Sequence, residues 1–353
     1  MKMKPILSKR SASNLALLGI LCLWMALPLA ARTVRIYVTN HAGTTITVVD
    51  PATNKVVQEI KNFEVPEAIH FSPDGSRAYI TQGGEKFLTV LDRKTGDVIK
   101  KVPISGHPND LAVTNDGKWI LVCVSDIPGG LDFIDASSLE KVKTLPATSR
   151  LHDVVISQDD KYAVATSPQG KFFTVFDLKK QEVAWHYIAD QDVLVPALEN
   201  APDGSARRVF VELSELNGFA VIDFESHKEA ARITFPDDLP KVVPSGTPTH
   251  GLGVSPDGKT IWAVSRLYDS VFVYSVPELK LLGHARLPEL DLPGHGGIGG
   301  SPNWITFAPD SKTAYVANAA NKTVSVIDAK SLKVLSNIPM GEQPGRMSTL
   351  ALP

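Results

Sequence analysis

Cysteine is nearly absent from this sequence. Cys22 and Cys123 are the only two among 353 residues. Cys22 lies in an N-terminal segment that we expect to be removed, which leaves Cys123 alone and excludes a disulfide within one monomer. The paired C-x-x-C and C-x-x-C-H patterns are therefore missing, and covalently attached haem is excluded. Cys123 lies in the apolar run from Trp119 to Val124, so we expect a buried and unreactive thiol.

An excess of charge of either sign is also missing. Lys and Arg number 36 against 38 Asp and Glu, which gives a formal net charge of −2. Nucleic-acid binders usually carry a basic field, so no nucleic-acid partner is expected. Disorder is excluded as well, because 43% of the residues are hydrophobic and the net charge is small. Helical periodicity is almost absent beyond the N-terminus, which points to an all-β protein.

The common catalytic motifs are missing too. The sequence has no G-x-S-x-G and no H-E-x-x-H, which removes the usual serine hydrolases and zinc proteases. The glycine-rich stretch GHGGIGGSPNW precedes a β-type segment rather than a helix and has no Lys with Ser or Thr. We interpret it as a flexible loop around His295 and not as a phosphate loop. Whether the protein is an enzyme stays open, because ligands can come singly from separate segments.

The N-terminus has the pattern of a targeting segment. Four basic residues within the first ten positions precede an uncharged, strongly apolar stretch that ends at Ala30 and Ala31. This pattern predicts a secretory signal peptide over residues 1–31 and a mature chain of residues 32–353. The mature protein is then periplasmic or secreted and has no membrane span. The alternative is a retained membrane anchor, since about 20 apolar residues can cross a bilayer.

The rest of the chain repeats with a period near 40 residues. RIYVTN with TTITVVD from Arg35 is followed by RAYITQ with FLTVLD from Arg77, and TAYVAN with TVSVID occurs from Thr313. Aspartate ends these strand-like segments at regular spacing. They are Asp50, Asp92, Asp135, Asp177, Asp223 and Asp328. Between Asp223 and Asp328, one further copy carries Tyr274-Ser275 where the aspartate would stand.

Each repeat contains four short strands, which we name A to D. Segments such as PEAIHFSPDG alternate apolar and polar residues and end in a tight turn, as a strand that enters a hairpin does. A strands are expected to start near Pro66, Pro108, Leu151, Leu194, Gly251, Pro302 and Pro344, and B strands near Arg35, Arg77, Trp119, Tyr162, Arg208, Ile261 and Ala314. Both counts predict a seven-bladed β-propeller. Because the chain begins with B and ends with A, the C-terminal segment should close the N-terminal blade.

The RIYVTN and TAYVAN strands, the SPDG turns and the VVD or VID strand ends resemble the YVTN-repeat family of bacterial seven-bladed propellers. The resemblance covers nearly the whole predicted mature chain and is weakest over residues 193–233. More distantly, the chain is similar to the haem propellers of nitrite reductases and to propeller lactonases. The resemblance implies the fold and leaves the activity open, because the shared residues build blades and one fold hosts many functions.

Strand order predicts where a site lies. Connections from D to A and from B to C share one face, and residues just before each A strand should ring the central channel there. Our candidate ligand-binding residues on this rim are His107, Asn109, Arg150, His152, His250, His295, Asn303 and Arg346. The wider rim includes Glu67, Asp110, Asp153 and Glu199, and the B-to-C loops add His41, Arg266 and Tyr268. Two long connections, 236–251 and 287–303, should form a wall or lid there. The opposite face, built from short turns, is expected to be plain.

Histidine next to carboxylate can bind a metal, form an acid–base pair or hold a haem. His152, His250 and Asp153 are the candidate metal ligands, and the cofactor, a divalent metal or a noncovalent haem, is left open. Arg150 and Arg346 are suited to an anionic ligand, with salt bridges between blades as the alternative. Polar channel lining that binds only ordered water is the structural alternative for the whole rim.

Three functions follow in order of preference. The first is a secreted or periplasmic binding or scaffold protein, a monomer, that holds a small molecule or a partner protein on the loop-rich face. The second is a metal-assisted lactonase or lyase that uses the rim histidines. The third is a redox-accessory propeller with noncovalent haem.

Overall fold

The computed structural model describes residue 1 and residues 33–242, 246–292 and 295–352, without the side chains of residues 291–298. The predicted signal segment and its alternative, a retained anchor, therefore lie outside the described residues. Within the described ranges, every regular element is a β-strand. A helix with the length and apolarity to cross a membrane is likewise not found in these ranges.

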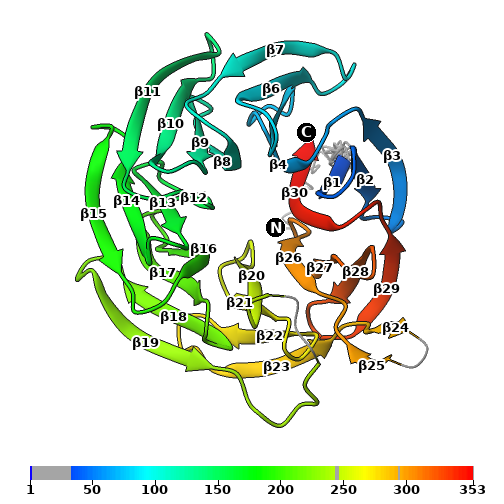
Figure 1. Cartoon of the computed structure of the whole chain (residues 1–353). Helices are drawn as coiled ribbons and strands as arrows, with labels where there is room; N and C mark the ends of the chain where they lie inside the picture. The colour runs from blue at the N-terminus through cyan, green and yellow to red at the C-terminus, as the bar shows by residue number, and fades with distance from the viewer. Residues whose placement is uncertain (2–32, 243–245, 293–294, 353) are drawn as a thin grey trace.

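Seven four-stranded sheets stand around one centre like the blades of a propeller (Figure 1). Blade one contains β1 (Thr33–Asn40), β2 (Thr45–Asp50), β3 (Lys55–Lys61) and β30 (Pro344–Leu352). Blade two contains β4 (Pro66–Phe71), β5 (Arg77–Gln82), β6 (Phe87–Asp92) and β7 (Val98–Pro103). Blade three contains β8 (Pro108–Val113), β9 (Trp119–Val124), β10 (Gly129–Asp135) and β11 (Glu140–Ala147). Blade four contains β12 (Val154–Ile156), β13 (Tyr162–Ser167), β14 (Phe172–Asp177) and β15 (Glu182–Ile188).

The remaining blades follow the same order. Blade five contains β16 (Val193–Asn200), β17 (Ala206–Leu213), β18 (Gly218–Asp223) and β19 (Lys228–Thr234). Blade six contains β20 (Thr249–Val254), β21 (Thr260–Ser265), β22 (Ser270–Ser275) and β23 (Leu281–Arg286). A hairpin of β24 (Leu290–Leu292) and β25 (His295–Ile298) precedes blade seven, which contains β26 (Pro302–Phe307), β27 (Thr313–Asn318), β28 (Thr323–Asp328) and β29 (Val334–Pro339).

The C-terminal strand closes the ring, as the sequence predicts. β30 pairs antiparallel with β1, with Tyr37 opposite Ser348 and Val38 opposite Met347. Figure 1 shows this red strand beside the blue strands of the chain start. The closure gives the first sheet its innermost strand, so β1 is not left as an unpaired edge. The predicted all-β, seven-bladed propeller is confirmed.

The repeated aspartate has a local structural role. At the end of β6, the Asp92 carboxylate accepts hydrogen bonds from the backbone N–H groups of Lys94 and Thr95, both at 2.8 Å. An aspartate that binds the amides two and three residues ahead fixes the start of a turn. In the same way, the Asp328 carboxylate accepts a hydrogen bond from the backbone N–H of Ser331 at 2.7 Å. The aspartate repeat is therefore the turn signal between the third and fourth strands of the blades.

Blades pack face to face through apolar side chains. Ala68 and Tyr79 of blade two join Leu111 and Val122 of blade three in one buried cluster. Near the axis, hydroxyl groups connect neighbouring blades, and the Oγ1 of Thr81 donates to the carbonyl of Asn109 at 2.7 Å. Cys123 is fully buried, as expected, and burial raises the pKa of its thiol.

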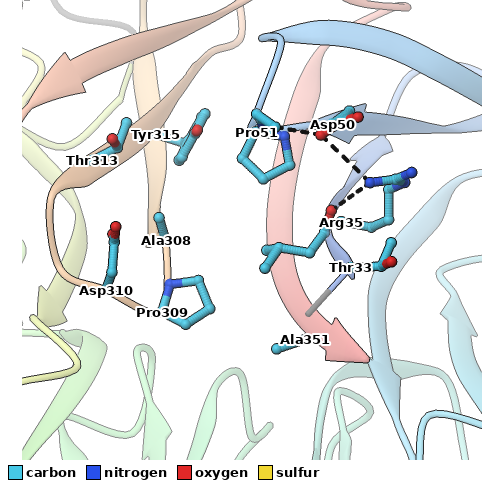
Figure 2. Close-up of a pocket in the computed structure, with 12 residues that line it drawn as sticks. Thr33, Arg35, Asp50, Pro51, Ala308, Pro309, Asp310, Thr313, Tyr315 and Ala351 are labelled. Atoms are coloured by element: carbon cyan, nitrogen blue, oxygen red, sulfur yellow. Dashed lines mark hydrogen bonds and ion pairs between the residues drawn. The ribbon is translucent and has the colours of Figure 1, made fainter. Parts of the chain in front are cut away.

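The face made by the A-to-B and C-to-D turns, here called the turn face, differs from the prediction. A cavity of about 530 Å³ opens on it between blades one and seven (Figure 2). Arg35 and Asp50 form an ion pair at 3.4 Å on one wall, and Tyr315 stands on the other. The turns themselves are short, as expected, but hollows form between adjacent blades, which the turn lengths do not reveal.

Candidate functional site

The strand register brings the residues before the inner strands to equivalent positions. Ile69 pairs with Ile80 in blade two, and Leu111 pairs with Val122 at the matching place in blade three. The residue two positions earlier in each blade forms what we call the inner ring. Its members are Glu67, Asn109, His152, Leu194, His250, Asn303 and Gly345. Four of the predicted ligand-binding residues thus share one level of the channel.

In blade one the inner-ring residue is Gly345, and the imidazole of His41 occupies the space beside it. A Cβ at Gly345 would collide with the His41 ring, so glycine leaves the space that the imidazole fills. The Nε2 of His41 lies 2.9 Å from the carbonyl oxygen of Glu67 and donates to it. Burial lowers the pKa of His41, although Glu67 opposes the shift. The imidazole is therefore neutral at neutral pH.

Arg346 lies across the channel and joins four blades. From β30, its Nη1 reaches Glu67 Oε2 at 3.1 Å, and its Nη2 reaches Asp153 Oδ1 at 2.6 Å and the side-chain oxygen of Asn109. Its Nε lies 3.6 Å from Asp110 Oδ1. The side chain is 7% exposed. Arg346 is thus engaged in salt bridges between blades, the alternative that the sequence left open, and its donors are already used.

The two buried aspartates beside Arg346 have pKa values shifted in opposite directions. Burial raises the pKa of Asp110, and repulsion from Asp153 adds to the shift although Arg346 opposes it. Burial alone would raise the pKa of Asp153 too, but the charges of His152 and Arg346 outweigh it and lower that pKa. The stable arrangement is an ionised Asp153 next to a carboxyl at Asp110 that takes up a proton more readily.

His152 and His250 face each other on the inner ring. Their ring centroids are 6.2 Å apart at an interplanar angle of 78°. The Nδ1 of His152 lies 2.7 Å from Asp153 Oδ2, and the Nδ1 of His250 lies 2.9 Å from the carbonyl oxygen of Asn303. A carbonyl accepts only, so His250 carries its proton on Nδ1 and presents Nε2 as an unprotonated nitrogen. Burial lowers the pKa of His250 to about 3, which keeps this form at neutral pH.

Arg150 stands two residues before His152 in the sequence, and the charge of Arg266 acts on His250. The Arg150 guanidinium has no partner among the described residues, and its Nε is buried. Arg266 donates from Nη2 to the side-chain oxygen of Asn303 at 2.6 Å and from Nε to the Pro302 carbonyl at 3.2 Å. Of the two, Arg150 is the one whose guanidinium has no hydrogen-bond partner in the described part of the chain.

Glu212 is a buried carboxyl that the sequence analysis missed. It is 0% exposed, and its Oε2 accepts from the backbone N–H of Gly251 at 3.0 Å, directly beside His250. Its Oε1 is buried without a partner among the described residues. Burial raises the pKa of Glu212 to about 8, although Gly251 and Arg266 oppose the shift. The signal was present in the repeat, because three other blades have threonine at the equivalent position. These are Thr39, Thr81 and Thr166.

Other predicted rim residues lie elsewhere. The prediction for Glu199 is wrong, because β16 starts at Val193 and places Glu199 near its far end, paired with Arg207 and Arg208. His107 lies on the expected face, 42% exposed, with its Nδ1 2.7 Å from Asp126. The His295 side chain lies outside the described residues, and Figure 1 shows its hairpin at the rim of blade seven, away from the inner strands.

The long connections meet at the β21–β22 loop. The Tyr268 hydroxyl donates to Asp237 at 2.6 Å in the first connection, and Asp269 accepts from the Gly300 N–H at 2.8 Å in the second. Both connections are thus tied to one loop of blade six. Their predicted role as a wall or lid stays a prediction, since residues 243–245 and 293–294 lie outside the described part.

A metal site at His152, His250 and Asp153 also stays a prediction. Among the residues that the structure describes, no three His, Cys, Asp or Glu side chains converge as ligands for a metal ion.

Comparison with known proteins assigns the chain to a family. The model of the "Cytochrome D1 heme domain" matches residues 34–349. The chain is 28% identical over 240 residues to a Pseudomonas aeruginosa protein named dihydro-heme d1 dehydrogenase, covering 63% of this chain and 45% of that protein. It is 31% identical over 90 residues to YncE of Salmonella typhimurium, which covers 26% of this chain and 25% of the relative. The chain thus spans less than half the length of these curated relatives.

Solved structures share the fold. A chain of Kuenenia stuttgartiensis hydrazine synthase superposes with a TM-score of 0.68 at 21% identity, covering 83% of this chain and 92% of that one. The dihydro-heme d1 dehydrogenase NirN in complex with DHE superposes with a TM-score of 0.59 at 18% identity, covering 89% and 74%. These likenesses support the repeat propeller predicted from the sequence. Because the family model spans nearly all of the described residues, the chain belongs to the Cytochrome D1 heme domain family.

Proposed function

We propose that the protein is a ligand-binding propeller that holds a haem-type tetrapyrrole, noncovalently, at the inner ring on the loop-rich face. The observation that carries the proposal is His250, whose Nδ1 is fixed by the Asn303 carbonyl and whose Nε2 is unprotonated. A histidine that binds a metal usually donates its other ring nitrogen to such an acceptor. Its position beside His152 gives the site a second imidazole.

The surrounding charges suit the carboxylates of a tetrapyrrole. Arg150 has no partner in the described part of the chain, and an unpaired guanidinium binds a carboxylate through two parallel hydrogen bonds. The names of the relatives add support, since one is named a dihydro-heme d1 dehydrogenase and the family model is that of a haem domain. The residues of this chain therefore fit the group, with His250 as the iron ligand and Arg150 as the carboxylate anchor.

Bound iron tetrapyrrole would supply a redox-active metal with a position for a small ligand. The chain's own contribution is binding and orientation. The Asn303 carbonyl orients His250, and the Asp153 carboxylate orients His152 and holds its proton on Nδ1. Arg346 stabilises the ionised form of Asp153 and so fixes this orientation. Divalent metal held by the same imidazoles is the competing occupant.

Titration of the purified protein with ferric protoporphyrin IX tests the proposal. We expect a shifted Soret band with saturable binding, and at least tenfold weaker binding for His250→Ala, because one coordinate bond is lost. Arg150→Gln should weaken binding by roughly tenfold through the lost charged hydrogen bonds. His284→Ala, on the exposed outer strand β23, is the matched control and should bind as the wild type does.

A shift that persists unchanged in His250→Ala, with a melting temperature equal to that of the wild type, would refute His250 as the ligand. Metal analysis of the same samples decides the alternative. Stoichiometric divalent metal that is lost in both His152→Ala and His250→Ala, without any Soret shift, would replace the tetrapyrrole with a metal site.

We propose that the protein works in the periplasm or outside the cell. The support is the basic start and the apolar segment that ends at Ala31. When the full chain is expressed in a secreting host, N-terminal sequencing of the soluble protein should begin at Arg32. Recovery of a chain that still begins at Met1 in the membrane fraction would instead establish a retained anchor.

A further inference from the structure

A second cavity lies in the channel on the other side of Arg346. It has a volume of about 550 Å³ and opens at the turn face. Its walls come mainly from the inner strands β26, β30 and β4, which stand side by side at the centre of Figure 1. Because the Arg346 side chain reaches blades two, three and four, it separates this cavity from the inner ring.

The cavity has one polar side. His70, Ser348 and Thr306 pair with the tyrosine at the same place in the second strand of blades two, one and seven. The equivalent residues of the other four blades carry no polar side chain. They are Ala112, Val155, Ala197 and Gly253. Polar groups at this level of the channel are thus confined to three consecutive blades, which supply all the described lining residues except Pro256 of blade six.

Two of these polar groups are available to a ligand. Thr306 is engaged with Thr349, with 3.0 Å between the hydroxyl oxygens. By contrast, the His70 ring and the Ser348 hydroxyl have no hydrogen-bond partner in the described part of the chain. Burial and the charge of Arg346 lower the pKa of His70 to about 4, so at neutral pH the ring offers one donor and one acceptor.

The other walls are mainly apolar and uncharged, and the hydroxyl groups of Ser72 and Thr349 are already bonded to Asp74 and to the Phe307 carbonyl. Phe71, Phe307, Met347 and Leu350 line the cavity, and no Asp, Glu, Lys or Arg is among its described lining residues. An ion that entered would lose hydration without meeting an opposite charge, which is costly. Aromatic walls favour a flat, apolar body. The volume lies within the range of about 300–1,000 Å³ that is typical of small-molecule sites.

We propose that this cavity binds a small, uncharged aromatic molecule with a hydroxyl or carbonyl group, which hydrogen-bonds to His70 and Ser348 while its ring packs between Phe71 and Phe307. The site is separate from the inner ring and does not depend on the function proposed for it. The bound molecule and the inner-ring ligand would occupy opposite ends of one channel, with Arg346 between them.

The test uses 2-naphthol as the probe, followed by its own fluorescence at pH 7. Wild-type protein should bind it saturably, and at least tenfold more tightly than 2-naphthoate, which has the same ring with a charge. His70→Phe keeps the size and removes the hydrogen bonds, so binding should weaken by roughly tenfold. Ser348→Trp fills the cavity and should abolish binding.

Val155→Thr is the matched control. It places a hydroxyl at the same level of the channel in blade four, outside the cavity lining, and should leave 2-naphthol binding unchanged. Addition of ferric protoporphyrin IX should leave it unchanged too, which separates this site from the inner ring. The proposal fails if 2-naphthoate binds as well as 2-naphthol. It also fails if His70→Phe and Ser348→Trp, both folded by their melting curves, retain wild-type affinity.

Discussion

Replacement of Arg346 by methionine should reduce the free energy of unfolding by about 3–5 kcal/mol at pH 7, because it leaves buried carboxylates without their cation. Arg346 contacts Glu67 at 3.1 Å and Asp153 at 2.6 Å, and all of these groups are largely shielded from water. Methionine has a similar length and an apolar end, so the change removes the charge and the hydrogen bonds more than it removes volume. Urea unfolding at several pH values measures the loss.

A matched arginine serves as the control. Arg35 pairs with Asp50 at 3.4 Å on the wall seen in Figure 2, where the two side chains are 28% and 20% exposed. Solvent screens such a pair, and Arg35→Met should cost less than about 1 kcal/mol. A loss below 1 kcal/mol for Arg346→Met as well would mean that the channel carboxylates are hydrated or protonated. The salt bridges of Arg346 would then not stabilise the fold.

A variant of Asp153 tests whether an unpaired buried charge causes the loss of stability in Arg346→Met. Asp153→Asn removes the carboxylate that lies nearest to Arg346. If the buried charge causes the instability, Arg346→Met should cost clearly less in an Asp153→Asn background than in the wild type, with a coupling of about 1.5 kcal/mol or more. The cost should also shrink as the pH falls, because protonation of Asp153 removes the unpaired charge. Asp153 has a lowered pKa, so its contribution to stability is present above the pKa of the unfolded chain and is lost in acid.

The fold could be predicted because local chemistry repeats. Most blades have an alternating strand, a tight turn of the Ser-Pro-Asp-Gly type and an aspartate that fixes the next turn, and these signals depend only on near neighbours. The predicted starts of the first and second strands of each blade agree with the observed starts to within three residues. In blade four the predicted inner strand starts at Leu151 but β12 starts at Val154. There the backbone of His152 and Asp153 still bonds to Thr166, at 2.8 and 3.0 Å, outside a regular ladder.

The site could be predicted only in part. Strand order alone places Asn109, His152, His250 and Asn303 on one ring, because each stands at the same point of its repeat. The partners of Arg346 could not be predicted, since they lie 193 to 279 positions away and depend on how far a long side chain reaches across the channel. Glu199 was misplaced for a related reason. Its repeat is the most divergent, so the register of that inner strand was the least certain.

Glu212→Gln is expected to make the protein more stable at alkaline pH. The Glu212 carboxyl is 0% exposed, and burial raises its pKa to about 8. A carboxyl with a raised pKa favours the folded state while it is protonated. Its contribution is complete below the pKa of the unfolded chain, near 4.5, and is lost progressively as the pH rises to about 8. Above that pH, the Glu212 carboxyl is ionised in the folded protein, which then holds a buried negative charge.

The size of the effect follows from the shift. One pKa unit corresponds to about 1.4 kcal/mol, so between pH 6 and pH 9 the wild type should lose roughly 2–3 kcal/mol through this group alone. Glutamine keeps the acceptor for the Gly251 N–H and has no proton to lose. The difference in unfolding free energy between Glu212→Gln and the wild type should therefore grow by that amount over this range. Because other groups titrate equally in both proteins, the difference isolates Glu212.

The neighbours of Glu212 set the control for this measurement. Arg266 favours the ionised form and Asp153 disfavours it, and both act on the same carboxyl. Arg266→Gln should therefore raise the pKa of Glu212 further and move the loss of stability to higher pH. Glu215→Gln, on the exposed loop after β17, should leave the pH profile as it is. A Glu212→Gln protein whose stability follows the wild type in parallel from pH 6 to pH 9 would show that Glu212 is ionised in the folded state throughout. The inner ring would then carry a fixed negative charge beside His250. That charge would make the site less favourable for an anionic ligand.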